Sequence, residues 1–266
     1  QYTNEADHMG ISVLRPDLNE SLLKFSVTGE AIIRFGMGAI KGVGEAAVEN
    51  IIEERTENGP YKSAFDCVKR VNLRSVNKRS IEALVMAGAF DCFENTHRAQ
   101  YFHRENEGAS SFIEILIKHG NSFQEKQNSM QQSLFGEADG VDVVDPELPV
   151  CPEWIVPTRL KHEKDVTGFY ISGHPLDDYK ITMDKYCNVE VNNLRSNMTK
   201  FAGTKVSFGG MITKSQQRVS KKGSPFGIFT IEDYSGQIDI MLFSEDYLKR
   251  KHFLDVGSNT PIISFS

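Results

Sequence analysis

The spacing of apolar residues changes along the chain and separates segments of different structure. In residues 1–36, two apolar runs flank the turn Thr28-Gly29-Glu30 and predict a β-hairpin. Residues 37–130 carry mainly helical periodicity, and from residue 201 onward apolar residues recur at every second position. We therefore expect a multidomain α+β protein with a mostly helical part first and a small β-domain last.

Within the helical part, the pattern predicts helix, turn and helix twice. The first unit has a turn over residues 40–44 and a helix over 45–55. The second has a short helix opened by Ser63, a polar turn, and a helix over 78–87 that Asn77 can cap and Gly88 can end. One such hairpin buries little apolar surface alone, so we expect the two to pair.

The first turn, Ile40-Lys41-Gly42-Val43-Gly44, places two glycines around one apolar residue just before a helix. Glycine permits a left-handed backbone and lets an anion approach, and a helix N-terminus favours negative charge by about 0.3–1 kcal/mol. This is the pattern of a helix-hairpin-helix. It predicts a sequence-independent contact between Lys41, Gly42, Val43 and Gly44 and the backbone of a nucleic acid.

The charge of the chain supports nucleic-acid binding only when it is taken segment by segment. The net charge is −6, yet residues 61–80 hold six basic residues against one acid, and residues 200–231 hold six and no acid. The second turn lacks the glycine pair. Its phosphate contacts are therefore expected from the side chains of Arg74, Asn77, Lys78 and Arg79.

Residues 131–157 are polar, acidic and proline-bearing, and are expected to form an exposed connector to a helical segment over 158–200. Gln131, Leu134 and Phe135 lie in this connector and have the composition of a peptide that docks into a partner's pocket. The same spacing also arises by chance at roughly the few-per-cent level, so the match is weak without its context.

The β-domain is expected to have strands over 206–212, 226–231 and 237–243, which suit the opening of an OB-type barrel. Only a fourth strand is expected in the tail, so the barrel is truncated. A basic loop over 214–225, with Arg218, Lys221 and Lys222, is a candidate for following the phosphates of a single strand. For Phe208, Phe226 and Phe229, stacking on bases and packing in the core both remain open, with core packing favoured.

The sequence gives little support to catalytic or metal sites, and we predict neither, nor a cofactor. The four cysteines have no zinc-ligand spacing and are expected to be reduced. His162-Glu163 lacks the second His of a metalloprotease helix, and His174 is expected to be a structural turn residue. Since no apolar run of about 18 residues and no signal peptide are found, we expect a soluble cytoplasmic chain without a membrane partner.

Four blocks of sequence, residues 9–19, 33–44, 77–91 and 168–176, resemble the family of bacterial DNA polymerase III alpha subunits in order and spacing. The resemblance covers nearly the whole chain. It implies the end of the fingers in residues 1–36, tandem helix-hairpin-helices that hold duplex DNA in 37–130, a clamp-binding peptide at Gln131, Leu134 and Phe135, and an OB domain for single-stranded template in 201–266.

The resemblance also implies that the polymerase palm, with its magnesium-binding aspartates, lies upstream of Gln1, so this chain alone should not polymerise. Two other hypotheses stay open from sequence. One is a stand-alone adaptor of DNA repair or recombination, which the sequence preceding Gln1 would distinguish. The other is an enzyme with a site around His174, for which His174→Ala would abolish turnover.

Overall fold

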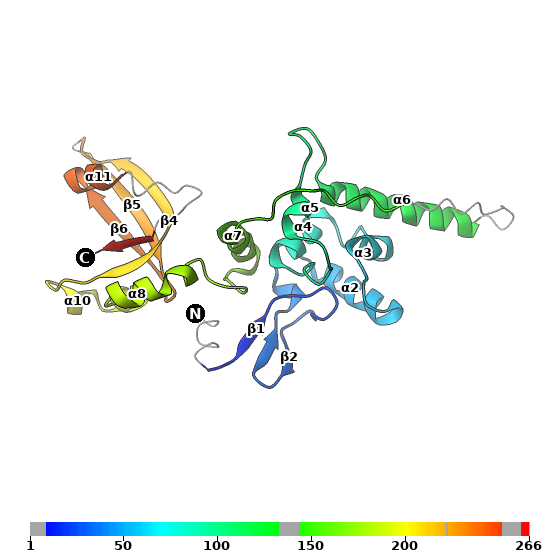
Figure 1. Ribbon diagram of the computed structural model, residues 1–266, viewed down its shortest axis with the longest axis horizontal. Helices are drawn as coiled ribbons and strands as arrows, with labels where there is room; N and C mark the ends of the chain where they lie inside the picture. The colour runs from blue at the N-terminus through cyan, green and yellow to red at the C-terminus, as the bar shows by residue number, and fades with distance from the viewer. Residues whose placement is uncertain (1–8, 133–143, 222, 252–261, 266) are drawn as a thin grey trace. The chain divides into compact units, whose positions relative to one another are not determined.

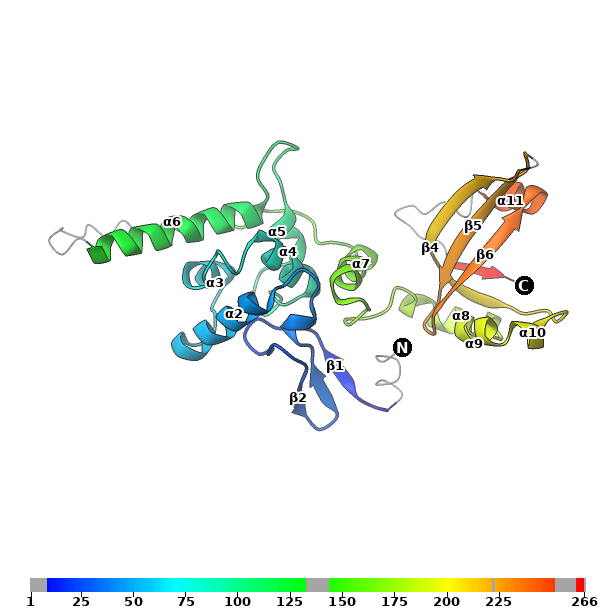
Figure 2. The same ribbon diagram turned by 180° about the vertical axis from the view of Figure 1, so that it is seen from behind.

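The computed structural model describes residues 9–132, 144–221, 223–251 and 262–265 of the chain. They form two compact units that divide between Gly173 and His174. The first unit is mainly helical and the second contains a sheet, as Figures 1 and 2 show from opposite sides. The predicted α+β class is therefore confirmed. No helix in the described ranges is long and apolar enough to cross a bilayer.

The first unit opens with a three-stranded sheet in the order β1-β3-β2. Its strands are β1 (Ser12–Leu14), β2 (Ser26–Gly29) and β3 (Ile32–Arg34). The antiparallel pair β2 and β3 is the predicted hairpin. Strand β1, which pairs in parallel with β3, was not predicted, because no turn signal links it to its partner as one links β2 to β3.

The helices of the first unit surround one core. They are η1 (Met37–Ala39), α2 (Glu45–Asn58), α3 (Ala64–Arg70), α4 (Lys78–Ala87), α5 (Arg98–Phe102), α6 (Phe112–Gln132) and α7 (Val156–Thr167). Val48 of α2, Leu84 of α4 and Ile113 of α6 are fully buried in this core. The two predicted helical hairpins therefore form one body. The far end of α6 stands clear of the other helices of the unit in both views.

Local hydrogen bonds explain where these helices begin and end. The Ser63 side chain accepts a hydrogen bond from the Asp66 N–H, and the Asn77 side chain accepts one from the Ser80 N–H, both at 3.1 Å. Gly88 ends α4 in the left-handed conformation, with φ +89°. These predicted caps are confirmed. On α6, Ile113 is buried in the core and Ile115 is exposed.

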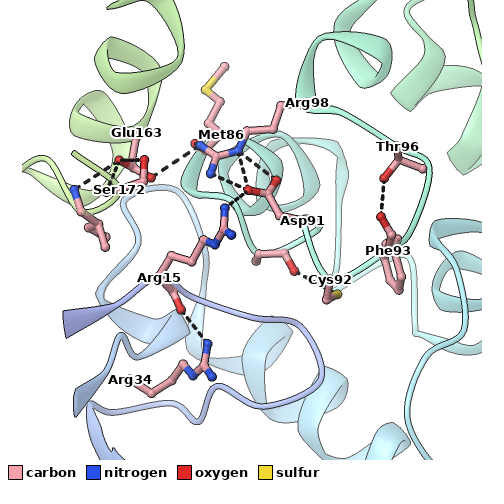
Figure 3. Close-up of polar contacts among 12 residues, drawn as sticks. Arg15, Arg34, Met86, Asp91, Cys92, Phe93, Thr96, Arg98, Glu163 and Ser172 are labelled. Carbon is pink, nitrogen blue, oxygen red and sulfur yellow. Dashed lines mark hydrogen bonds and ion pairs between the residues drawn. The ribbon is translucent and has the colours of Figure 1, made fainter. Parts of the chain in front are cut away.

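A buried polar network joins distant segments of the first unit (Figure 3). Arg98, only 4% exposed, donates to Asp91 at 2.7 Å, and Arg15 donates to the same carboxylate oxygen. Glu163 of α7 is fully buried, lies 3.6 Å from Arg98 and accepts a hydrogen bond from the Ser172 N–H. The network thereby fixes the end of the second hairpin and the position of α7.

The second unit is built on a four-stranded antiparallel sheet in the order β6-β5-β4-β7. Its elements are η2 (Asp177–Tyr179), α8 (Lys180–Tyr186), α9 (Val191–Ser196), α10 (Met198–Phe201), β4 (Phe208–Val219), β5 (Pro225–Glu232), β6 (Gln237–Phe243), α11 (Ser244–Arg250) and β7 (Ile262–Phe265). The three predicted strands and the tail strand are confirmed. Among the described strands the sheet stays open, as expected of a truncated barrel.

The predicted basic loop over 214–225 is wrong over its first half. Strand β4 continues to Val219 and stays paired with β5 as far as Val219 opposite Pro225. The exposed polar side chains of this stretch hid its strand character from the hydrophobic pattern. Arg218 therefore lies on a strand and not in a loop.

Candidate nucleic-acid interface

The first glycine turn packs against the helix of the second hairpin. Gly42 has φ +100°, a conformation that favours glycine. A Cβ atom there would lie 3.5 Å from Arg79 Nε and 3.6 Å from Ala83 Cβ. The turn of one hairpin and a basic side chain of the other are thus brought together, although they are 37 positions apart in sequence (42 and 79).

Gly44 is the N-cap residue of α2 and leaves this helix start open. Its backbone is extended, at φ −80° and ψ 151°, and no side chain caps the helix. The space that a Cβ would occupy has no atom within 4 Å. The first N–H groups of a helix have no partner within it and attract anions. An anion can therefore approach this exposed end closely.

The neighbours of these glycines have different roles. Lys41 is exposed, while its N–H donates to the Val166 carbonyl at 2.8 Å and ties the turn to α7. Val43 is buried in the core and its N–H donates to the Ile40 carbonyl. Val43 therefore supports the turn from within the core, and Lys41, Gly42 and Gly44 are the residues of this turn with surface accessible to a ligand.

The second turn uses its own side chains to satisfy its backbone. The Asn72 side chain accepts from the Arg74 N–H at 3.0 Å, and Asn77 accepts from Ser80. Arg74 and Arg79 are both exposed, and neither forms an ion pair with a residue that the structure describes. This turn consequently offers guanidinium groups where the first offers N–H groups.

Lys78 differs from the two arginines because it is already paired. Its ammonium lies 2.9 Å from Glu114 and 3.7 Å from Glu82. The hydrogen bond from Lys78 lowers the pKa of Glu114 to about 2, with a further hydrogen bond from the Ser111 N–H. Among the residues predicted to contact phosphate in this turn, Lys78 is therefore the one whose charge is already paired with neighbouring acids.

The outer face of the sheet in the second unit carries a basic and aromatic row. The register sets Arg218 of β4 opposite Phe226 of β5, and Phe226 opposite Phe243 of β6. The two rings are stacked with centroids 5.6 Å apart, and Phe243 is 57% exposed. Phe243 was missed from sequence, although it occupies the last outward position of the alternating run in β6.

The other residues proposed for single-strand contact are placed differently. Phe208 and Phe229 are buried, so the core interpretation is confirmed for both and they offer no stacking surface. Lys221 is exposed at the β4–β5 turn, whereas Lys222 lies outside the described residues. Only Phe226 of the three predicted aromatics reaches the outer face.

The docking peptide falls largely outside the described part of the chain. Gln131 belongs to the last turn of α6, and Leu134 and Phe135 lie beyond the residues that the structure describes. The prediction for this peptide therefore remains a prediction.

The residues considered for catalysis occupy structural positions. The His174 ring packs on the Tyr234 ring at 4.4 Å, and the His174 N–H donates to Asp177. Glu163 belongs to the buried network described above. The four cysteines are free thiols, and the described residues contain no group of three potential metal ligands.

Comparisons with known proteins match both units. A family model described as a helix-hairpin-helix motif matches residues 10–101, and one described as an OB-fold nucleic acid binding domain matches residues 206–259. DNA polymerase III subunit alpha of Vibrio cholerae is 32% identical over 99% of this chain and 22% of its own length. The subunits of Pseudomonas aeruginosa and Escherichia coli are 32% and 30% identical over 96% and 95% of this chain. The chain thus spans about a fifth of the length of these relatives.

Proposed function

The chain belongs to the family of DNA polymerase III alpha subunits, and we propose that it is a non-catalytic, DNA-binding part of a replicative polymerase of the bacterial cytoplasm. In this proposal the first unit contacts the backbone of duplex DNA and the sheet of the second unit contacts a single strand. The alternative of a stand-alone adaptor is not favoured, since the similarity extends over both units and the segment between them.

The observation that carries the duplex proposal is the meeting of Gly42 with Arg79. An uncapped helix start, an exposed Lys41 and an exposed guanidinium converge there from two hairpins. Backbone N–H groups and basic side chains bind phosphate without reading bases. Binding should accordingly be independent of sequence.

The row of Arg218, Phe226 and Phe243 supports the single-strand proposal. The exposed Phe243 ring, stacked on the half-buried Phe226 ring beside a guanidinium, provides the two contacts that single-strand binders use, base stacking and phosphate pairing.

The polar connector supports a third proposal, that residues 131–135 bind a sliding clamp. Replacing Leu134 and Phe135 by Ala should then remove clamp binding and leave duplex binding unchanged.

Duplex binding by the chain at several salt concentrations tests the main proposal. The logarithm of the affinity should fall with the logarithm of salt by about 0.9 for each phosphate neutralised. Arg74→Gln and Arg79→Gln should each reduce this slope by about 0.9, and Lys78→Gln should reduce it by less because Glu114 already holds Lys78. Lys249→Gln, on α11, is the matched control. Absence of binding, or binding that salt does not weaken, would contradict the proposal.

A further inference from the structure

The outer face of the sheet has a hollow of about 640 Å³ at the end away from Phe226 and Phe243. Lys214 of β4, Thr230 of β5 and Asp239 of β6 form one cross-strand row within it. This row is four residues along each strand from the aromatic row, a separation of roughly 13 Å. The hollow is thus a second feature of the same face.

The hollow combines an apolar lining with charges of both signs. Ile228 contributes apolar surface, and Lys214 and Arg195 contribute positive charge. Asp239 is an acid among these cations. Its Oδ1 accepts a hydrogen bond from the Thr230 hydroxyl at 2.7 Å, which orients the carboxylate. Among the described residues, Thr230 is its only hydrogen-bonding partner.

A carboxylate in this position has a clear chemical preference. It accepts hydrogen bonds and donates none, so it repels phosphate and any base edge that presents only acceptors. Cytosine presents the N4 amino donor where thymine presents the O4 acceptor. The two bases are similar in size, so a side chain that accepts hydrogen bonds and donates none would distinguish them by hydrogen bonding.

We propose that this hollow is a nucleobase pocket in which Asp239 accepts a hydrogen bond from an amino-bearing base, while Lys214 and Arg195 contact the adjoining phosphates. The inference rests on the proposed single-strand function and deepens it. It gives the single-strand face a base preference, for cytosine over thymine, that stacking on Phe226 and Phe243 alone would not produce.

Binding of fluorescein-labelled dC and dT octamers to the whole chain, followed by anisotropy at one salt concentration, tests the pocket. The chain should bind dC about tenfold more tightly than dT, the size of one hydrogen bond to a charged group. Asp239→Asn should bring this ratio close to one, because an amide both donates and accepts. The amide oxygen still accepts from Thr230.

Asp246→Asn is the matched control, since Asp246 is an exposed acid of α11 paired with Arg250. It makes the same change in charge and should leave the dC to dT ratio intact. Phe243→Ala should weaken both octamers equally.

Two results would overturn the inference, and they can be told apart. If the chain binds neither octamer, the single-strand function is wrong and the pocket with it. If it binds single strands without preferring dC, or if Asp239→Asn leaves the dC to dT ratio as Asp246→Asn does, the pocket is wrong while the single-strand function stands.

Discussion

The two helical hairpins of the first unit share a fold and differ in the chemistry that they present. The first turn leaves the start of α2 uncapped and carries glycine where a ligand can approach. In the second turn, Asn77 caps α4 and Asn72 binds the Arg74 N–H. The first hairpin thus exposes backbone donors, and the second consumes its own and exposes guanidinium groups instead.

The difference between the two turns affects helix stability and ligand access in opposite directions. Replacement of a side-chain cap by alanine costs roughly 1 kcal/mol, but relative to a glycine such as Gly44 the cap stabilises the helix by only a few tenths of a kcal/mol. The second hairpin has this small stabilisation, and its proposed phosphate contacts are made by long side chains. The first forgoes it, which keeps its helix N-terminus available to an anion. In the proposed complex, the two turns therefore divide the phosphate contacts between main-chain donors and charged side chains.

The two hairpins are expected to unfold together, because they share one core. The largest expected effect on stability comes from breaking the buried network around Arg98. Arg98→Met would leave Glu163, which is fully buried, without its cation. Removal of one partner from a buried ion pair costs about 3–5 kcal/mol of unfolding free energy. Urea unfolding can be followed by the fluorescence of Trp154, the only tryptophan of the chain, which packs against Phe102 and His162 of this unit.

Arg15→Met is the control for this network, because Arg15 is half-exposed and its ion pair with Asp91 should contribute less than about 1 kcal/mol. Equal effects of the two substitutions would contradict the role assigned to Arg98. Separate unfolding transitions within the first unit would contradict a single body for the two hairpins.

The proposed binding of phosphate at the N-terminus of α2 can be tested by adding a side-chain cap at Gly44. Gly44→Asp fits the extended backbone and open space, and it should change the unfolding free energy by only a few tenths of a kcal/mol. The new carboxylate occupies the position proposed for a phosphate. Duplex affinity should therefore fall by about tenfold or more.

Asn77→Asp introduces the same charge at the matching position of the second hairpin and preserves the cap. Its duplex affinity should fall less, since the N–H groups there are already used. Gly44→Ser, a cap without charge, should lie between the parent and Gly44→Asp. A larger loss for Asn77→Asp than for Gly44→Asp would reverse the assignment of the two turns.

Much of this contrast was accessible from sequence because it rests on local chemistry. The glycine turn, the caps at Ser63 and Asn77 and the stop at Gly88 each depend on residues within one turn of a helix. Such short-range patterns determine the backbone whatever surrounds it. The helices and main strands followed from their periodicity for the same reason.

The parts that sequence could not supply depend on contacts between distant residues. Nothing in the local pattern indicates that Arg79 packs over Gly42 or that Lys78 pairs with Glu114. The extension of β4 through Arg218, and its alignment with Phe226 and Phe243, depend on strand register. The sequence therefore predicts the kinds of site, and tertiary packing determines which of the charged and aromatic residues are available at the surface.

The smallest expected effect on duplex affinity concerns Lys78, because its ion pairs with acids limit its contribution to phosphate binding. Glu114→Gln can keep the capping box with Ser111 and remove the charge that holds Lys78. Duplex affinity should rise by no more than about threefold, with a steeper salt dependence as Lys78 becomes free. Lys78→Gln added to this variant should abolish the gain. If the gain persists, it comes from loss of the acid's own repulsion of DNA.

The same substitution has a pH signature that is independent of DNA. The folded state lowers the pKa of Glu114 from 4.5 to about 2, so its ionised form stabilises the fold above pH 4.5. This contribution should be lost as the pH falls from 4.5 to about 2. The difference in unfolding free energy between parent and Glu114→Gln, measured by Trp154 fluorescence, should therefore shrink over that interval. A difference that is constant from pH 7 to 2 would mean that Lys78 is not paired with Glu114 in solution and is as available to phosphate as Arg74 and Arg79.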